Sequence, residues 1–432
     1  MSFARQGVGT LLARVIVYGA LFIANILIAR YLGPAGKGQI ALIIFAITVV
    51  IDVSMLGVPA ALSYYIGRRI FEPRRILGAS IPLYTVTVLT FSAAYFLALP
   101  WLRKNFFADM PAWLPLVALL AFPLTLWTNY AIYTFVGMGR IRLYNLLEIT
   151  DRVSYLLFQA LILVAVSRTV AGVIYAELLG RGLACAVACW LLWKLVRPAV
   201  AFSAREAKQL LGYGLRAHII TITTIIAFRI GMYILRYYRD DAAVGQYALA
   251  LNVAELLLFI PNSFGVVLFA RTANTSDEEA NLFTPVATRN VLLVTAISAV
   301  LLALAAPILI PAVFGKAFTP SLAPFVVLLP GVVIFSIYRV LSYDLMARGM
   351  PLRVSLAAGA GLAANVITGL MLVPGMGAIG AAWGNFAGYT ITSVIVLAQY
   401  IFVSRTPLLD LLIFKPSDLR FYSKLFNRRP GN

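Results

Sequence analysis

The sequence predicts an all-α, polytopic membrane protein with about twelve spanning helices in two six-helix repeats of parallel topology. The prediction depends on an extreme apolar composition, on apolar runs of spanning length throughout the chain, and on motif pairs at a near-constant offset. Hydrophobic residues fill 62% of the 432 positions, charged residues fill 12%, and the mean hydropathy is +0.92. A water-soluble protein could not bury that much apolar surface beneath a polar shell.

Apolar runs of about 20 residues, the helix length that crosses ~30 Å of hydrocarbon, recur along the whole chain. We expect spans at residues 11–31, 38–65, 76–99, 113–137, 146–166, 170–195, 212–235, 244–269, 291–313, 322–346, 354–373 and 378–402. The first run is too long for the apolar core of a signal peptide and has no small-residue cleavage site. It is therefore expected to be the first span.

The basic residues indicate how these helices are oriented. With twelve spans, both termini and the even-numbered loops share one side, and 23 of the 35 lysines and arginines fall there. Eight fall on the opposite side: Arg30, Lys37, Arg103, Lys104, Arg168, Arg236, Arg239 and Lys316. Because short cytoplasmic loops are rich in Lys and Arg, we expect both termini in the cytoplasm. The net charge of +19 then fits loops that face anionic lipid headgroups rather than a nucleic-acid-binding protein.

Motif pairs in the two halves predict an internal repeat. Gly38-Gln39, followed by Ala41-Leu42, recurs as Gly245-Gln246, followed by Ala248-Leu249, at an offset of 207. Further glycine pairs keep the order and nearly the offset: Gly139 with Gly349 at 210, and Gly172 and Gly180 with Gly380 and Gly388 at 208. Each half then holds six spans, so the repeats cross the membrane in the same direction.

The repeat divides the chain into three predicted parts. Residues 1–200 form an N-terminal six-helix bundle, residues 201–405 a C-terminal six-helix bundle, and residues 406–432 a basic cytoplasmic tail. We expect the bundles to move about the linker near Ser203, as parallel repeats of carriers commonly do. In the tail, four apolar residues share one helical face, which suits an interfacial helix on an anionic leaflet; a loose basic tail is the alternative.

Eight ionisable residues within the predicted spans are the candidate functional residues. The substrate-binding candidates are Arg229, Arg339, Arg14 and Arg181, and the coupling or charge-balance candidates are Asp52, Glu255, Asp344 and Glu177. A charge in hydrocarbon is costly, so such groups pair, face a neighbouring helix or line a water-filled cavity.

The candidates differ in how readily packing alone explains them. Glu177 and Arg181 are four residues apart with the acid first, a favourable helical ion pair, so a structural role is favoured. Asp344 and Arg14 lie near cytoplasmic ends, where extension to the headgroups is the favoured explanation. The other four lie deeper, and both a structural and a functional role stay open for them; Glu255 and Asp344 are the expected partners of Arg229 and Arg339.

No catalytic, metal or cofactor site is indicated. Cys185 and Cys189 lie four apart in one apolar run, which suits packing rather than a disulfide. The single histidine, His218, has no acid beside it and is favoured as a packed or interfacial residue. Metalloprotease, phosphate-loop and dinucleotide motifs do not occur. We therefore do not expect an enzyme.

Several runs resemble a known family. Residues 29–38, 56–62, 365–382 and 415–419 are similar to conserved-looking stretches of the Wzx-type polysaccharide-transporter flippases, within the multidrug/oligosaccharidyl-lipid/polysaccharide exporter superfamily. One position departs from it, because Gly231 stands where relatives often have an acid. The matching residues are packing and turn residues, so they identify the fold, related to that of the multidrug exporters, more firmly than the substrate.

The resemblance implies a function in the bacterial inner membrane. A Wzx-type protein flips a polyprenyl-pyrophosphate-linked saccharide, such as an O-antigen unit, by alternating access. Arginines suit its phosphates because a guanidinium stays charged and binds two oxygens at once. Expected partners are this lipid-linked saccharide, anionic lipids and other membrane proteins of polysaccharide assembly. The alternatives are a cation-coupled multidrug exporter of the same superfamily and, less favoured, a saccharide polymerase or ligase, which usually has a larger external loop.

Overall fold

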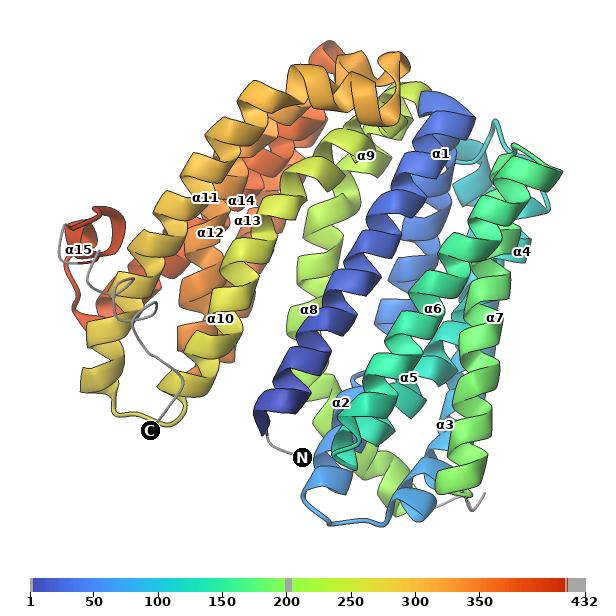
Figure 1. Ribbon diagram of the computed structural model, residues 1–432, viewed down its shortest axis with the longest axis horizontal. Coiled ribbons are helices and arrows are strands. Elements are labelled where there is room, and N and C mark those ends of the chain that lie inside the picture. Colours follow the sequence, from blue (N-terminus) through green and yellow to red (C-terminus); the bar gives the residue numbers. More distant parts are fainter. Residues whose placement is uncertain (1–2, 199–203, 416–417, 419–432) are drawn as a thin grey trace. The chain divides into compact units, whose positions relative to one another are not determined.

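The computed structural model describes residues 3–198, 204–415 and 418, and within these ranges the regular structure is helical, with no β-strand (Figure 1). The first half contains α1 (Phe3–Ser54), α2 (Val58–Gly67), α3 (Pro73–Asn105), α4 (Leu114–Leu119), α5 (Ala121–Gly137), α6 (Ile141–Leu161) and α7 (Val170–Leu195). The second contains α8 (Ala204–Tyr238), α9 (Asp241–Glu255), α10 (Phe259–Thr272), α11 (Asp277–Phe314), α12 (Leu322–Ala347), α13 (Pro351–Met376), α14 (Ala378–Ser404) and α15 (Leu408–Leu412).

The spans expected from the sequence are present. Ten segments of the described residues are long and apolar enough to cross a membrane, and one of them, Leu12–Ser54, has 43 residues. Gly33, with φ 65° and ψ −171°, breaks this segment, so it holds two spans. Counting both, together with the 35-residue helix α8, gives the twelve expected.

The second span is itself discontinuous. Its first part ends at Ser54, and α2 begins at Val58 after a turn in which Leu56 and Gly57 both have positive φ. A leucine in this conformation is uncommon and costs free energy. The turn therefore re-aims α2 relative to the preceding part of the span.

The helices form two compact units. Unit 1 contains residues 1–222 together with 239–245 and 313–315, and unit 2 contains residues 223–238, 246–312 and 316–432. In unit 1, α7 packs on α5 and α6, and α1 packs on α6. In unit 2, α14 packs on both α12 and α13, and α10 packs on α12. Ser203, the expected pivot, lies outside the described residues.

The repeat-related glycines make equivalent contacts in the two units. In unit 1, a Cβ on Gly180 of α7 would lie 2.7 Å from the backbone N of Tyr155 in α6. In unit 2, a Cβ on Gly388 of α14 would lie 2.9 Å from the backbone O of Gly361 in α13. Each glycine thus allows the last long helix of its half to approach the preceding one closely, and Figure 1 shows both pairs running side by side.

Candidate functional site

Unit 1 buries one arginine among acidic and hydroxyl groups. Arg181 of α7 is 9% exposed, and its Nη2 lies 2.6 Å from Oε1 of Glu177 one turn earlier. Its Nη1 donates to Oγ1 of Thr125 in α5. The expected ion pair between Glu177 and Arg181 is therefore present, and its contact with α5 makes it part of the helix packing.

Two other candidates of unit 1, Asp52 and Arg14, have different charged neighbours. Asp52 is partly buried, and Arg181 is the charged group that acts on it electrostatically. Arg14 is exposed on α1, where it lies beside Tyr144 and Glu148 of α6. Arg181 thus interacts with the acids Glu177 and Asp52, and Asp151 of α6 acts on it as well.

Unit 2 holds a second charged cluster. Nη2 of Arg229 in α8 lies 2.9 Å from Oε2 of Glu255 at the end of α9, and Nη1 donates to Oδ1 of Asn252 at 3.1 Å. The two charged side chains are 30% and 17% exposed. The spacing of Asn252 and Glu255, one helical turn apart, lets both acceptors reach the same guanidinium.

Arg339 of α12 acts on the same carboxylate, that of Glu255. Its Cζ lies 5.3 Å from the ring centroid of Phe335, one turn earlier, a cation–π distance. Both Arg229 and Arg339 act electrostatically on Glu255, and Tyr389 of α14 is its hydroxyl neighbour. Arg229, Arg339 and Glu255 together carry a net charge of +1 when all are ionised.

A chain of neutral polar groups lies in the same unit. Nδ2 of Asn365 donates to Oδ1 of Asn385 at 2.6 Å, and Nδ2 of Asn385 donates to the Tyr247 hydroxyl at 2.7 Å. A Cβ on Gly231 would lie 2.9 Å from this hydroxyl. The position where relatives often have an acid is therefore next to a tyrosine hydroxyl, and a carboxylate there would require Tyr247 to move.

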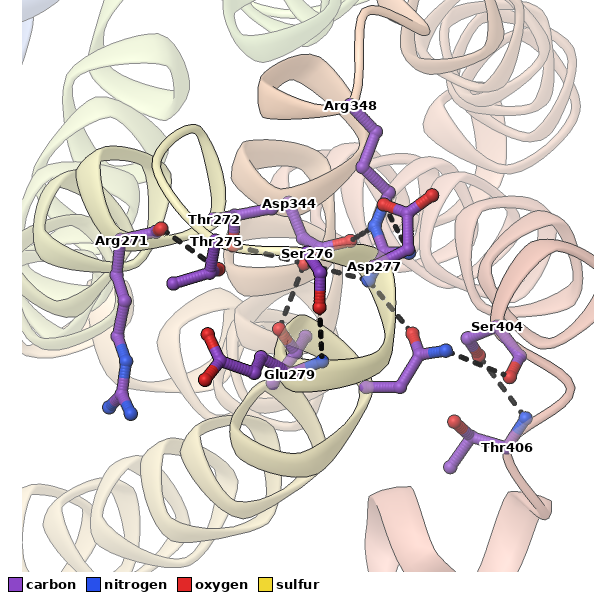
Figure 2. A network of polar contacts seen from close by, with 12 residues as sticks. Arg271, Thr272, Thr275, Ser276, Asp277, Glu279, Asp344, Arg348, Ser404 and Thr406 are labelled. Carbon is purple, nitrogen blue, oxygen red and sulfur yellow. Dashed lines mark hydrogen bonds and ion pairs between the residues drawn. The ribbon is translucent and has the colours of Figure 1, made fainter.

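Asp344 does not extend to the headgroups, and it does not pair with Arg339. The residue is completely buried, and Nε of Arg348, one turn later in α12, lies 2.6 Å from its Oδ2. The hydroxyls of Thr272 and Thr284 donate to Oδ1 at 3.2 and 2.8 Å. Figure 2 shows this network between the ends of α10, α11 and α12. A buried carboxylate such as Asp344 needs a cation as its partner, and Arg348 of the same helix is that cation.

Arg348 follows the span predicted at residues 322–346, so the sequence prediction did not include it as a partner of Asp344. Its side chain is 3% exposed, and it also reaches Oδ1 of Asp277 at 3.2 Å and Oδ1 of Asn281 at 2.9 Å. The available signal was the spacing, because Asp344 and Arg348 are four apart with the acid first, as Glu177 and Arg181 are.

A second buried ion pair was also missed. Arg289 of α11 binds both carboxylate oxygens of Asp418 through Nε and Nη2, and its Nη1 donates to the backbone O of Asp410 at 2.9 Å. Their side chains are 7% and 3% exposed. The Arg289 guanidinium holds the pKa of the Asp418 carboxyl below its ordinary value of 3.8. This pair attaches the chain after α14 to unit 2.

Long apolar helices with charged clusters buried inside each unit define a multi-pass membrane protein. A family model described as polysaccharide biosynthesis protein matches residues 3–274, and the chain belongs to this family. Comparison with curated proteins gives no match.

Solved structures share the fold at low sequence identity. The chain is similar to an inward-facing multidrug resistance MATE family transporter of the MOP superfamily, with TM-score 0.76 and 15% identity over 90% of this chain and 94% of that one. It is similar to the lipid II flippase MurJ in an inward closed conformation, with TM-score 0.73 and 14% identity over 99% and 94%. The eukaryotic MATE transporter AtDTX14 gives TM-score 0.62 and 13% identity over 92% and 98%. The expected family and the expected helical membrane fold are confirmed.

Proposed function

We propose that the protein flips a polyprenyl-pyrophosphate-linked saccharide across the bacterial inner membrane by alternating access. The head group of such a lipid cannot cross hydrocarbon unaided, because its charges and hydroxyls would lose their hydration. The family and the fold support transport in polysaccharide biosynthesis. The MurJ structure is named for a lipid-linked substrate, which makes the same class of cargo a natural candidate here.

The observation that carries the proposal is the excess positive charge of the unit 2 cluster. Two guanidinium groups, Arg229 and Arg339, act on the single carboxylate of Glu255. An anion with several phosphate oxygens would balance this charge and accept hydrogen bonds from a guanidinium in two-pronged geometry. We assign the phosphate contacts to Arg229 and Arg339, the two cations that act on Glu255.

A cation-coupled multidrug exporter is the second candidate, and one observation favours it. In unit 1, Arg181 pairs with Glu177 and also acts electrostatically on Asp52, so Asp52 is an acid in excess of this ion pair. The same acid can serve a flippase as a site that balances charge or couples an ion. The unit 1 cluster therefore fits both candidates, whereas the unit 2 cluster fits an anionic substrate.

Transport by the purified protein in liposomes distinguishes the two candidates. One set of liposomes carries a fluorescent polyprenyl-pyrophosphoryl saccharide, and the other carries a lipophilic cation such as ethidium. We expect the saccharide lipid to become accessible to a membrane-impermeant quencher from the opposite leaflet, with no cation flux. Flux of the cation without movement of the lipid would replace the flippase proposal with the exporter.

A further inference from the structure

Unit 1 carries an aromatic cluster that neither buried charged cluster includes. It consists of Tyr64 and Tyr65 of α2, Phe71 of the following loop, and Tyr213 of α8; these four residues are called the tyrosine cluster below. The rings of Tyr64 and Tyr213 stack with centroids 4.5 Å apart and an interplanar angle of 18°. Tyr65 meets Tyr64 edge-on at 5.3 Å and Phe71 at 5.5 Å.

The first part of α8 is held against α2, which fixes the cluster. A Cβ on Gly214 would lie 2.8 Å from the backbone C of Gly57, so the two backbones touch where α2 begins. The Tyr65 hydroxyl donates to the backbone O of Gln209 at 3.4 Å. Helical side chains lean toward the N-terminus of their helix, so Tyr213 reaches back from Gly214 toward Tyr64.

The stacked pair, Tyr64 and Tyr213, has exposed ring surface and hydroxyl groups that packing does not occupy. Tyr64 is 38% exposed and Tyr213 is 37% exposed. Within the described residues, neither hydroxyl makes a hydrogen bond, in contrast to that of Tyr65. Packing alone therefore does not account for the hydroxyls of Tyr64 and Tyr213.

Basic residues are frequent in the chain segments that carry the pair. Residues 66–75 and 204–215 contain six basic side chains and two acidic ones: Arg68, Arg69, Arg74, Arg75, Arg205 and Lys208, with Glu72 and Glu206. Arg75 is paired with the buried Glu206 at 2.5 Å. Arg68 and Arg74 are exposed and make no ion pair in the described part of the chain, and Cζ of Arg68 lies 6.0 Å from the Tyr64 ring centroid.

Arg69 occupies a position that favours glycine. It ends α2 with φ 56°, and the amides of Arg69 and Ile70 donate to the backbone O atoms of Ile66 and Tyr65, the pattern of a Schellman helix end. A glycine would adopt this conformation without strain. An arginine here places an exposed charge two residues before Phe71 at a conformational cost.

We propose that Tyr64 and Tyr213, with Arg68, bind the glycosyl pyrophosphate head group of the substrate before this head group crosses the membrane. The proposal rests on the proposed function and adds a second, peripheral site to it. Aromatic rings with free hydroxyls suit a sugar, which offers apolar C–H faces and hydroxyl groups, and arginines suit the pyrophosphate. The distribution of basic residues assigns this end of unit 1 to the cytoplasm, the side on which the lipid-linked saccharide would be loaded.

Calorimetric binding with two soluble probes tests the site. The full-length protein, in nanodiscs of phosphatidylcholine, is titrated with a short-chain prenyl-pyrophosphoryl N-acetylglucosamine and with the same prenyl pyrophosphate lacking the sugar. We expect Tyr64→Ala and Tyr213→Ala to raise the Kd of the sugar probe about five- to tenfold and to leave the Kd of the sugar-free probe unchanged. Arg68→Gln should weaken both probes, because both contain the pyrophosphate.

Matched variants control for folding and for general surface effects. Tyr64→Phe and Tyr213→Phe keep the ring stack and remove only the hydroxyl, so each should fold normally and weaken the sugar probe about threefold. Tyr237→Ala changes a tyrosine near the other end of α8 that is 62% exposed, and it should bind both probes like the unaltered protein.

Three results would overturn the proposal. The first is unchanged binding in both tyrosine-to-alanine variants, or equal weakening of the two probes. The second is displacement of the sugar probe by phosphatidylglycerol in the nanodiscs, which would assign the site to lipid headgroups. The third is probe binding that depends on Arg339 but not on the tyrosines, which would leave the proposed function standing. Absence of binding by the unaltered protein would instead count against the proposed function itself.

Discussion

Gly38 and Gly245 touch backbone to backbone in unit 1, and the contact is reciprocal. A Cβ on Gly38 would lie 2.9 Å from the backbone N of Gly245, and a Cβ on Gly245 would lie 2.9 Å from the backbone N of Gly38. Each would also collide with a carbonyl, that of Asp241 for Gly38 and that of Pro34 for Gly245. Pro34 and Asp241 are also 207 residues apart. Equivalent residues of the two sequence repeats thus contact each other here.

The contact predicts that Gly38→Ala destabilises the protein. A methyl group at this position has no space against a backbone carbonyl, which cannot move as a flexible side chain can. We expect a loss of about 1–3 kcal/mol in the free energy of unfolding, the usual cost of overpacking, seen as a lower thermal midpoint in detergent. Gly19→Ala is the control, because nothing lies within 4 Å of a Cβ there. Equal midpoints for the two variants would contradict the geometry.

Asp344 predicts a large stability effect from a single carboxylate. Asp344→Ala leaves Arg348, with a side chain only 3% exposed, without its buried counter-charge. Removing one partner of a buried pair typically costs about 3–5 kcal/mol. Asp277→Ala removes the other acid near Arg348, but Asp277 is 74% exposed, so we expect less than about 1 kcal/mol. Chemical unfolding of both variants measures the two losses in free energy. A larger loss in Asp277→Ala than in Asp344→Ala would contradict the role of Asp344 in the network of Figure 2.

The Arg289–Asp418 pair predicts a defined pH dependence. In the folded protein the pKa of Asp418 is lowered below its ordinary value of 3.8. The pair therefore contributes its full stability above pH 3.8, and this stability is lost as the pH falls through the lowered pKa. Hydrogen exchange at residues 408–415, corrected for intrinsic rates, should therefore stay slow at pH 5 and become fast only below 3.8.

Two variants check the assignment to Asp418. Asp418→Asn should exchange fast at every pH, because it cannot form the ion pair. Lys415→Ala should exchange like the unaltered protein, since the Lys415–Asp410 pair is 45% and 41% exposed and such pairs contribute little. Slow exchange in Asp418→Asn at pH 7 would show that Asp418 does not hold the segment.

The orientation of the helices is tested by thiol labelling. Single cysteines are placed at Lys104, Lys316 and Arg74 in a protein whose Cys185 and Cys189 have been replaced. The 23-to-8 distribution of basic residues predicts that an impermeant maleimide labels the first two sites in intact cells and the third only after lysis. Labelling of the Arg74 site alone in intact cells would invert the topology.

The fold was predictable because its determinants are local or periodic. Spanning helices require long apolar runs, and close helix contacts require small residues, so Gly180 and Gly388 revealed both the repeat and the packing. The break at Gly33 was also accessible, since Gly-Pro follows an apolar run directly. The turn at Leu56 was not, because a leucine in left-handed conformation has no sequence signal and is held there by tertiary contacts.

The charged clusters were only partly predictable, because pairing depends on which helices meet. The pairs within one helix, Glu177–Arg181 and Asp344–Arg348, have a readable spacing, although only the first was recognised. The pair of Arg229 and Glu255 links two helices, and sequence alone could propose but not select it. The pair of Arg289 and Asp418 is 129 residues apart and gave no signal.

The central claim is that the unit 2 arginines bind an anionic saccharide lipid, and the flipping rate of Arg339 variants in liposomes tests it most directly. Arg339→Ala should lower the rate at least about tenfold while thermal stability stays near that of the unaltered protein. Arg339→Lys should recover part of the rate, because the charge remains but the two-pronged geometry is lost. A rate in Arg339→Ala equal to that of the unaltered protein would contradict the account.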